Sequence, residues 1–149
     1  MSVRYGFSFD KDSCIQCHGC EVACKVWRNV ETNVKWRWVE NIWKKSYPDA
    51  ENYSASIACL HCVEPLCVEA CPVEAISKRG KDGIVVVDRE TCIGCKACLD
   101  ACPYHVPAFG TDDKMQKCDM CHGIIDINTQ NPPCVISCPT GALAFGKLT

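Results

Sequence analysis

Short apolar segments, each followed by a polar turn, recur along this chain of 149 residues. Residues 7–9 read Phe-Ser-Phe before an acidic turn, and residues 84–88 read Ile-Val-Val-Val-Asp. Both segments have the length and apolar character of short β-strands. Gly80 and Gly83 predict a hairpin turn just before the second strand. The pattern predicts an α+β protein with little regular secondary structure.

These segments belong to an internal repeat. Residues 7–17 and 85–95 both run from an apolar strand through an acidic turn into a loop that contains cysteine. Residues 72–76 and 139–143 share a turn that begins with proline and leads into a short strand or helix. Such self-similarity indicates two related units, with a pseudo-twofold relation between the halves of the pattern.

The longest stretch without cysteine, residues 25–58, contains all four tryptophans of the chain. Val34, Trp36 and Trp38 alternate with two basic residues, which predicts a half-buried strand. Three roles are open for this Trp-rich insertion. It could be a packed cover over the remaining chain, a docking face for a partner, or a stacking surface for single-stranded nucleic acid. No nucleic-acid fold pattern accompanies it, so the third role has the least support.

Cysteine is the outlier of the composition, with sixteen residues in four groups. Every group ends with the step Cys-x3-Cys, and a proline follows the last three groups, whereas Lys25 follows the first. A proline at this position stops the local chain from continuing as helix. The groups are Cys14, Cys17, Cys20, Cys24; Cys59, Cys62, Cys67, Cys71; Cys92, Cys95, Cys98, Cys102; and Cys118, Cys121, Cys134, Cys138.

The spacing of the cysteines is typical of 4Fe-4S clusters. A cubane cluster has four iron corners, and each corner binds one thiolate. In bacterial ferredoxins the run Cys-x2-Cys-x2-Cys-x3-Cys-Pro gives three ligands to one cluster and the fourth to another. Residues 92–103 contain this run in full, and the other groups vary it by one gap or by the missing proline. We therefore expect sixteen iron ligands, four 4Fe-4S clusters and no open iron corner. A chain of this kind transfers electrons and is not an enzyme by itself.

Three other uses of the cysteines are weaker. A zinc site also needs four ligands, but three cysteines within seven residues followed by Cys-Pro fit a cubane cluster better than zinc. Disulfides would need secretion, and the amino terminus has no signal-peptide pattern. Two segments match the c-type haem motif Cys-x-x-Cys-His, but a dihaem protein would leave most of the cysteines unexplained.

The histidines are expected near clusters or at the surface, not as ligands: His18, His61, His105 and His122.

Charge and hydropathy limit the partners. The formal net charge of −2 gives no strong field for nucleic acid. The apolar runs are too short to cross a bilayer, so no direct membrane insertion is expected. Without a signal peptide, the expected location is cytoplasmic, and the alternative is export of the folded chain together with a partner that carries the signal.

With these quartets and their order, the chain resembles the four-cluster iron–sulfur subunits of molybdenum- and tungsten-pterin oxidoreductases. The widened second group at residues 59–67, the strand and loop at 88–95, and the segment 117–121 carry the resemblance. It implies tandem bacterial-ferredoxin-like dicluster modules that relay electrons to or from a large catalytic subunit of the dimethyl sulfoxide reductase or aldehyde oxidoreductase family. A flavin or membrane electron-acceptor subunit is a further partner. The chain ends soon after Cys138, which makes a small soluble form, as in tungsten aldehyde oxidoreductase complexes, an equal alternative to a membrane complex.

The resemblance also implies how the groups pair. Groups one and four form module A, from residues 1–24 and 110–149; groups two and three form module B, from residues 59–109; the Trp-rich insertion covers residues 25–58. The implied ligand sets are site A1 (Cys14, Cys17, Cys20, Cys138), site A2 (Cys118, Cys121, Cys134, Cys24), site B1 (Cys59, Cys62, Cys67, Cys102) and site B2 (Cys92, Cys95, Cys98, Cys71).

Three lysines stand next to cysteines, and each could stabilise the more negative, reduced state of a cluster. A solvated lysine at the surface is an equally good interpretation for each. They are Lys25, Lys96 and Lys117.

Overall fold

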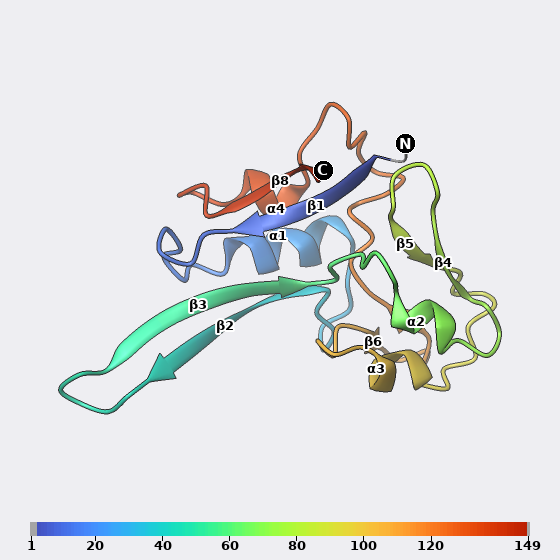
Figure 1. Cartoon of the computed structure of the whole chain (residues 1–149), viewed down its shortest axis with the longest axis horizontal. Coiled ribbons are helices and arrows are strands. Elements are labelled where there is room, and N and C mark those ends of the chain that lie inside the picture. Colours follow the sequence, from blue (N-terminus) through green and yellow to red (C-terminus); the bar gives the residue numbers. More distant parts are fainter. Residues whose placement is uncertain (1–2, 149) are drawn as a thin grey trace.

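The computed structural model describes residues 3–148, which form short helices and four antiparallel pairs of strands. Figure 1 shows their arrangement, with the long hairpin of β2 and β3 projecting from a body of short helices, strands and loops. In chain order the elements are β1 (Arg4–Phe9), α1 (Gly19–Trp27), β2 (Arg37–Lys44), β3 (Glu51–Ala58), α2 (Leu66–Glu69), β4 (Ile76–Lys78), β5 (Val85–Val87), α3 (Ala97–Ala101), β6 (Ala108–Phe109), β7 (Met115–Gln116), α4 (Pro133–Ile136) and β8 (Leu143–Leu148).

The two ends of the chain form the first ferredoxin-like unit. Strands β1 and β8 pair along their whole length, with Arg4 opposite Leu148 and Phe9 opposite Leu143. Helices α1 and α4 pack against each other beside this pair (Figure 1). The elements that flank cysteine groups one and four therefore lie together.

The middle of the chain forms the second unit. Strands β4 and β5 pair as a hairpin, with Ile76 opposite Val87, and α2 packs against α3. The turn between the strands is closed by backbone hydrogen bonds between Arg79 and Ile84 at 2.8 Å and between Gly83 and Arg79 at 2.9 Å. Gly83 has φ of 72°, a conformation that glycine adopts without strain. The predicted hairpin turn is confirmed.

The internal repeat is visible in the turns that follow β1 and β5. The carboxylate of Asp10 accepts a hydrogen bond from the Ser13 hydroxyl at 2.6 Å, and that of Asp88 accepts one from Thr91 at 2.7 Å. Both aspartates also accept a backbone N–H two residues further on, each at 3.0 Å. The same acidic turn therefore leads into the cysteine loops of groups one and three.

The Trp-rich insertion folds differently from the predicted alternation. Its strand β2 begins at Arg37, and Arg37 is only 2% exposed, whereas Trp38 stays partly exposed. The strand predicted at residues 34–38 was wrong for most of its length, because β2 begins only at Arg37. Arg37 is buried because its guanidinium stacks on Phe7, 4.3 Å from the ring centroid. At the far end of the hairpin Trp43 is 71% exposed. The base of the insertion is packed, and its tip is not.

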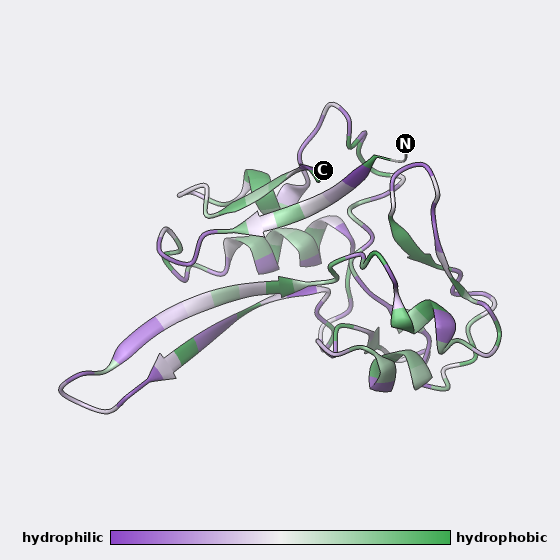
Figure 2. Ribbon diagram, in the orientation of Figure 1, coloured by the Kyte–Doolittle hydropathy of each residue, from purple (hydrophilic) through white to green (hydrophobic). Residues whose placement is uncertain are grey.

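Apolar packing is limited in the described part of the chain. Figure 2 shows hydrophobic residues dispersed along the ribbon among hydrophilic ones. Among the buried apolar residues, two small clusters pack together: one contains Ile76, Val85, Cys98 and Met115, and the other contains Tyr5, Ile84 and Met120. Between residues 3 and 148, no helix has the length and apolar character to cross a membrane.

Candidate iron–sulfur centres

The four cysteines of site B2 line one cavity. Its walls include Ile76, Phe109 and Met115, so the cysteines meet in an apolar surrounding. Two backbone N–H groups point at the sulfur atoms, from Ala75 to Cys71 Sγ at 3.3 Å and from Met115 to Cys92 Sγ at 3.4 Å. The cysteines around this cavity are Cys71, Cys92, Cys95 and Cys98.

Site A1 has the same form at the other unit. Its cavity is closed by Phe9 and Leu143, the last pair of β1 and β8. The backbone N–H of Gln16 points at Cys14 Sγ at 3.5 Å, and Cys20 Sγ lies 3.5 Å from the Ser56 hydroxyl. The cysteines around this cavity are Cys14, Cys17, Cys20 and Cys138.

The cysteines of sites A2 and B1 are also brought together. Burial raises the pKa of Cys24 and of Cys67, and each is raised further by three neighbouring thiols. For Cys24 these thiols are Cys118, Cys134 and Cys121. For Cys67 they are Cys59, Cys102 and Cys62. Each set of four thiols predicted from the sequence is therefore contiguous in space.

The order of the sites follows from which thiols of one set act on the pKa of a thiol in another set. Besides burial, the pKa of Cys98 is raised by Cys67, which brings B2 next to B1. Burial and Cys59 both raise the pKa of Cys118, which brings B1 next to A2. Burial and then Cys20 raise the pKa of Cys134, against the charge of Arg37, which brings A2 next to A1. The four sites form a row in the order A1, A2, B1, B2.

The two ends of this row reach the surface. Cys17 of site A1 and Cys95 of site B2 are exposed. Ile15 and Ile93, in the same two loops, are 61% and 64% exposed. In contrast, all four cysteines of site A2 are buried. An electron can therefore be delivered at either end without approaching the inner sites from solvent.

Left-handed backbone conformations shape the cysteine loops. Gln16 and Gly94 occupy matching positions with φ of 59° and 71°, and His18 and Lys96 precede α1 and α3 with φ of 58° and 63°. These conformations turn the chain tightly between cysteines that are two residues apart. The loop then enters a short helix that carries the third cysteine of its set.

Lys25 and Lys96 differ in how they relate to the cluster sites. The Nζ atom of Lys25 donates to the carbonyl groups of Glu31, Thr32 and Val34 at 2.9, 2.9 and 2.6 Å. Lys96 is exposed, borders the cavity of site B2 and lies over the Phe109 ring, 5.7 Å from its centroid. Lys25 therefore organises the start of the insertion, whereas Lys96 stays in a position to stabilise the reduced state of a cluster at B2.

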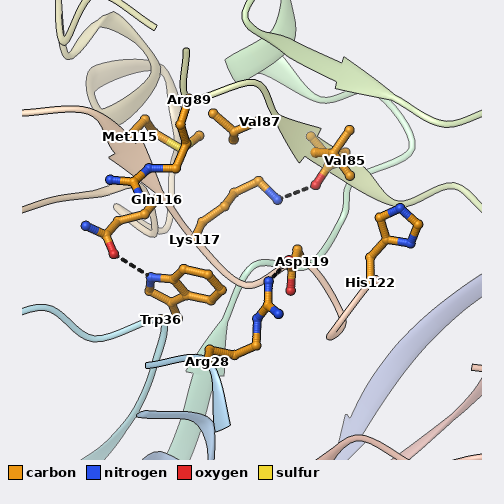
Figure 3. Close-up of a pocket in the computed structure, with 11 residues that line it drawn as sticks. Arg28, Trp36, Val85, Val87, Arg89, Met115, Gln116, Lys117, Asp119 and His122 are labelled. Carbon is orange, nitrogen blue, oxygen red and sulfur yellow. Dashed lines mark hydrogen bonds and ion pairs between the residues drawn. The ribbon is translucent and has the colours of Figure 1, made fainter. Parts of the chain in front are cut away.

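Lys117 occupies the seam between the two units. It is 4% exposed, and its Nζ donates to the carbonyls of Val85 at 2.5 Å and Cys118 at 2.9 Å. Figure 3 shows its side chain directed across the pocket between β5 and the segment after β7. In the same pocket Trp36 Nε1 donates to Gln116 Oε1 at 3.0 Å. The seam thus contains a buried cation adjacent to sites A2 and B1.

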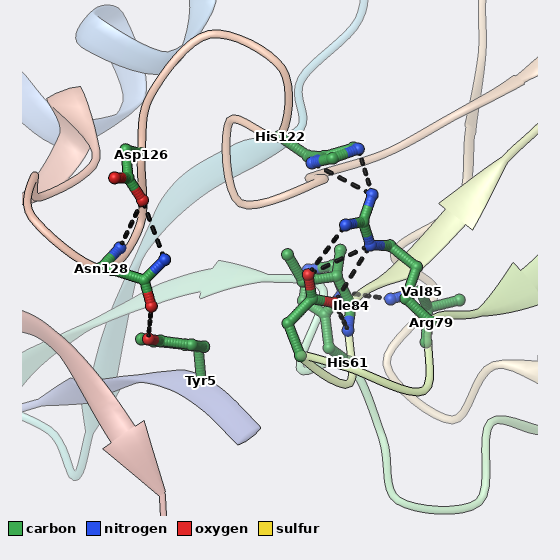
Figure 4. Close-up of polar contacts among 9 residues, drawn as sticks. Tyr5, His61, Arg79, Ile84, Val85, His122, Asp126 and Asn128 are labelled. Atoms are coloured by element: carbon green, nitrogen blue, oxygen red, sulfur yellow. Dashed lines mark hydrogen bonds and ion pairs between the residues drawn. The ribbon is translucent and has the colours of Figure 1, made fainter. Parts of the chain in front are cut away.

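His61 was not expected to bind metal, and the structure gives it a different task. It is 1% exposed, and its Nδ1 accepts the backbone N–H of Val85 at 2.9 Å (Figure 4). Burial first, then the charges of Lys117 and Arg37, hold its pKa well below the ordinary value. The neutral ring therefore carries its proton on Nε2, which is buried and has no hydrogen-bond partner in residues 3–148. An orphaned N–H beside site B1 suits a cluster sulfur as acceptor.

The donor set fits iron–sulfur clusters. Burial and neighbouring thiols raise the pKa of Cys98 to about 11 and that of Cys121 to about 12. Burial raises the pKa of Cys118 to about 11. Empty thiols of this kind stay protonated at neutral pH, whereas metal coordination deprotonates them and supplies the missing charge compensation. All-sulfur donors, N–H groups that point at sulfur and buried cations match what a cubane cluster needs.

Fold and sites together define a ferredoxin-type protein with two pairs of cluster sites. Residues 50–148 and 13–76 each match a family described as "4Fe-4S dicluster domain". One chain of the anaerobic dimethyl sulfoxide reductase of Escherichia coli is 39% identical over 160 residues, which cover 99% of this chain and 76% of that protein. The thiosulfate reductase electron transfer subunit of Salmonella typhi is 38% identical over 99% of this chain and 78% of its own length. One subunit of the sulfite dehydrogenase of Allochromatium vinosum is 33% identical over 93% of this chain and 67% of its own.

The chain belongs to the 4Fe-4S dicluster family, among the iron–sulfur electron-transfer subunits of oxidoreductase complexes. It carries four 4Fe-4S clusters and is not catalytic by itself. The predictions of fold class, cofactor and electron transfer are confirmed.

Proposed function

We propose that this chain passes electrons one at a time along the row A1, A2, B1, B2, between a molybdenum-pterin catalytic subunit and a second redox partner. The observation that carries the proposal is the row itself, with an exposed cysteine at each end. A row with two accessible ends suits a relay between two partners. A carrier with one docking site would need only one accessible cluster.

The cluster supplies the one-electron chemistry, and the chain controls its surroundings. With four thiolates on each cluster no iron corner is free for substrate. The apolar walls of sites A1 and B2, such as Phe9 and Phe109, exclude water. Backbone N–H groups such as those of Ala75 and Met115 donate to sulfur and stabilise the reduced state.

The identity of the large partner is inferred from the relatives. Three of these relatives are subunits of dimethyl sulfoxide reductase, thiosulfate reductase and sulfite dehydrogenase. We therefore favour a molybdenum-pterin partner of the dimethyl sulfoxide reductase type over a tungsten aldehyde oxidoreductase. A flavin or membrane electron-acceptor subunit is the natural second partner, since the opposite end of the row needs its own donor or acceptor.

We keep the division into modules A and B, with one adjustment. Strands β6 and β7 pair across the expected boundary between residues 109 and 110. Met115 also packs with Ile76 and Val85. These contacts support extending module B to Gln116. The modules would then meet at Lys117.

We propose a cytoplasmic location for assembly, because the cysteines have to be reduced when they bind the clusters. Thiols remain reduced in the cytosol, where clusters can be inserted before any export with a partner. Separation of soluble, membrane and exported fractions, probed for this chain with and without its partner, tests this location.

The relay proposal is tested by anaerobic purification from the native source. The expected complex contains a large subunit with bound molybdenum and pterin, and about sixteen irons for each copy of this chain. Zinc in place of iron, far fewer irons, or a chain that purifies alone with full iron and no partner would contradict it.

Electron paramagnetic resonance tests the ligand sets separately. If Cys24 completes site A2, Cys24→Ala and Cys121→Ala change the same cluster signal, and Cys14→Ala changes another. If Cys24→Ala instead changes the signal that is lost in Cys14→Ala, the pairing is wrong although the relay still stands.

A further inference from the structure

Arg37 is a buried cation for which the described chain offers no counter-ion. It is 2% exposed, and none of the ion pairs among residues 3–148 includes it. An uncompensated charge is unfavourable in a protein interior, so a negative group has to lie close to it. The nearest arginine of the insertion, Arg28, differs in this respect because it pairs with Asp119.

Two contacts fix the guanidinium and leave one donor unused. Its central carbon lies 4.3 Å from the centroid of the Phe7 ring, and Nη1 donates to Ser56 Oγ at 3.0 Å. Nη2 is buried and has no hydrogen-bond partner in residues 3–148. A planar donor group that is held from two sides presents its free N–H groups in a fixed direction.

The unused donor lies beside site A2. Burial raises the pKa of Cys24, Cys118 and Cys134, and the charge of Arg37 opposes that rise at all three. Arg37 is also within hydrogen-bonding reach of the Cys134 thiol. At Cys98 of site B2 the largest influences on the pKa are burial and the neighbouring thiols Cys67 and Cys95 instead. Its charge therefore acts on one inner site far more than on the distant end of the row.

We propose that Arg37 sets the reduction potential of the cluster at site A2, by holding a permanent positive charge and an N–H donor against it. This inference rests on the proposed ligand set of A2. Reduction adds one electron to an anionic cluster, and no bond forms or breaks. The added negative charge is stabilised by the guanidinium, so Arg37 makes this cluster easier to reduce. Arginine stays protonated, so the effect does not depend on pH.

The test is a redox titration of the full-length chain, with any partner that purifies with it, followed by electron paramagnetic resonance. Cys121→Ala identifies the A2 signal as the one it changes or abolishes. Arg37→Gln is expected to keep its full iron content and to shift the midpoint potential of that signal to a more negative value. The other three signals move less, with A1 second because Ser56 joins Arg37 to Cys20.

Two further variants separate this role from general charge and from folding. Lys44→Gln removes one charge from the other end of the same strand, where Lys44 lies 5.2 Å from the Tyr53 ring centroid but is exposed. It is expected to shift none of the four potentials. Arg37→Lys keeps the charge and loses the planar fork, so a smaller shift in the same direction is expected.

The outcomes are distinct. Unchanged potentials in an iron-replete Arg37→Gln protein overturn the proposal, as does an equal shift in Lys44→Gln. If Arg37→Gln fails to assemble, Arg37→Met takes its place, because it also removes the charge and the donor but keeps an apolar stem against Phe7, and an unchanged A2 potential in that variant overturns the proposal. If Cys24→Ala and Cys121→Ala change different signals, the ligand set fails and the role of Arg37 falls with it.

Discussion

Modules A and B contain the same parts in a different chain order. In module B the chain runs through group two, α2, the β4–β5 hairpin, group three and α3 without interruption. In module A the strand, cysteine group and helix of one half come first, and those of the other half come last, so β1 meets β8 only at the end of the chain. The local module can form as soon as its segment is made, whereas module A needs contacts between distant residues.

The connection also changes the parts themselves. Strands β1 and β8 of module A have six residues each, and β4 and β5 of module B have three. Helix α1 continues past Cys24 to Trp27, but α3 ends at Ala101, just before the Cys102-Pro103 step. Since proline cannot continue a helix, Lys25 in place of proline lets α1 run on into the insertion. The insertion then supplies Arg37 to module A, whereas module B receives its buried cation from Lys117.

Removal of iron is expected to have the largest effect, because both modules should then unfold and no difference between them would remain. The buried apolar groups are small, so the clusters have to hold the cysteine loops together. We expect the iron-free chain to lose both modules and to show no cooperative thermal transition by circular dichroism. A sharp transition in iron-free protein, protected from oxidation, would show that apolar packing alone specifies the fold.

Exchanging the residues that follow cysteine groups one and three tests why α1 is longer than α3. Lys25→Pro places proline at the seventh residue of the nine-residue helix α1 and removes the amine that binds three carbonyls. We expect about 3 kcal/mol of destabilisation or more. The matched change Pro103→Lys affects an exposed position after a helix and should cost less than about 1 kcal/mol. Thermal loss of cluster absorbance measures both, and equal losses would refute this explanation.

The sequence predicted what depends on residue type at fixed spacing. The four cysteine groups, the acidic turns and the hairpin at Gly80 and Gly83 each need particular residues a few positions apart. Burial of Arg37 could not be read in this way, because it depends on Phe7 and Ser56, which approach from other strands. The period-2 pattern at residues 34–38 was wrong about where the strand begins, because only its last two residues lie in β2. The length of α1 has a sign in the sequence, because Lys25 follows Cys24 where the other groups have a proline that would end the helix. The ligand pairing stays a prediction that the contiguity of the thiols supports.

The matching left-handed positions, Gly94 and Gln16, differ in how closely the backbone is approached. A Cβ atom at Gly94 would press against the carbonyl oxygen of Asp113, and its φ of 71° is strained for other residues. Gly94→Ala should therefore cost about 1–2 kcal/mol, seen as faster thermal loss of cluster absorbance. Gln16→Gly relieves similar strain but adds backbone entropy to the unfolded chain, so a change near zero is expected. A neutral Gly94→Ala would show that module B does not need this close approach.

The smallest effect is expected where the modules are most alike. Hydrogen bonds from Ser13 and the Asp12 N–H lower the pKa of Asp10, and bonds from Thr91 and the Glu90 N–H lower that of Asp88. A carboxyl with a lowered folded-state pKa contributes stability above the unfolded value, near pH 4, and loses it as the pH falls through the folded value.

Asp10→Asn and Asp88→Asn should each lower the thermal midpoint slightly at neutral pH. The difference in thermal midpoint between each variant and the wild type should shrink below about pH 4. The acid sensitivity of the clusters is common to all three proteins, so it cancels in these differences. Equal differences for the two variants support the view that the two acidic turns contribute the same stability to both modules. A clearly larger difference for Asp10 would mean that the long-range closure of β1 on β8 makes module A depend more on its turn, and the two modules would then differ even where their hydrogen bonds match.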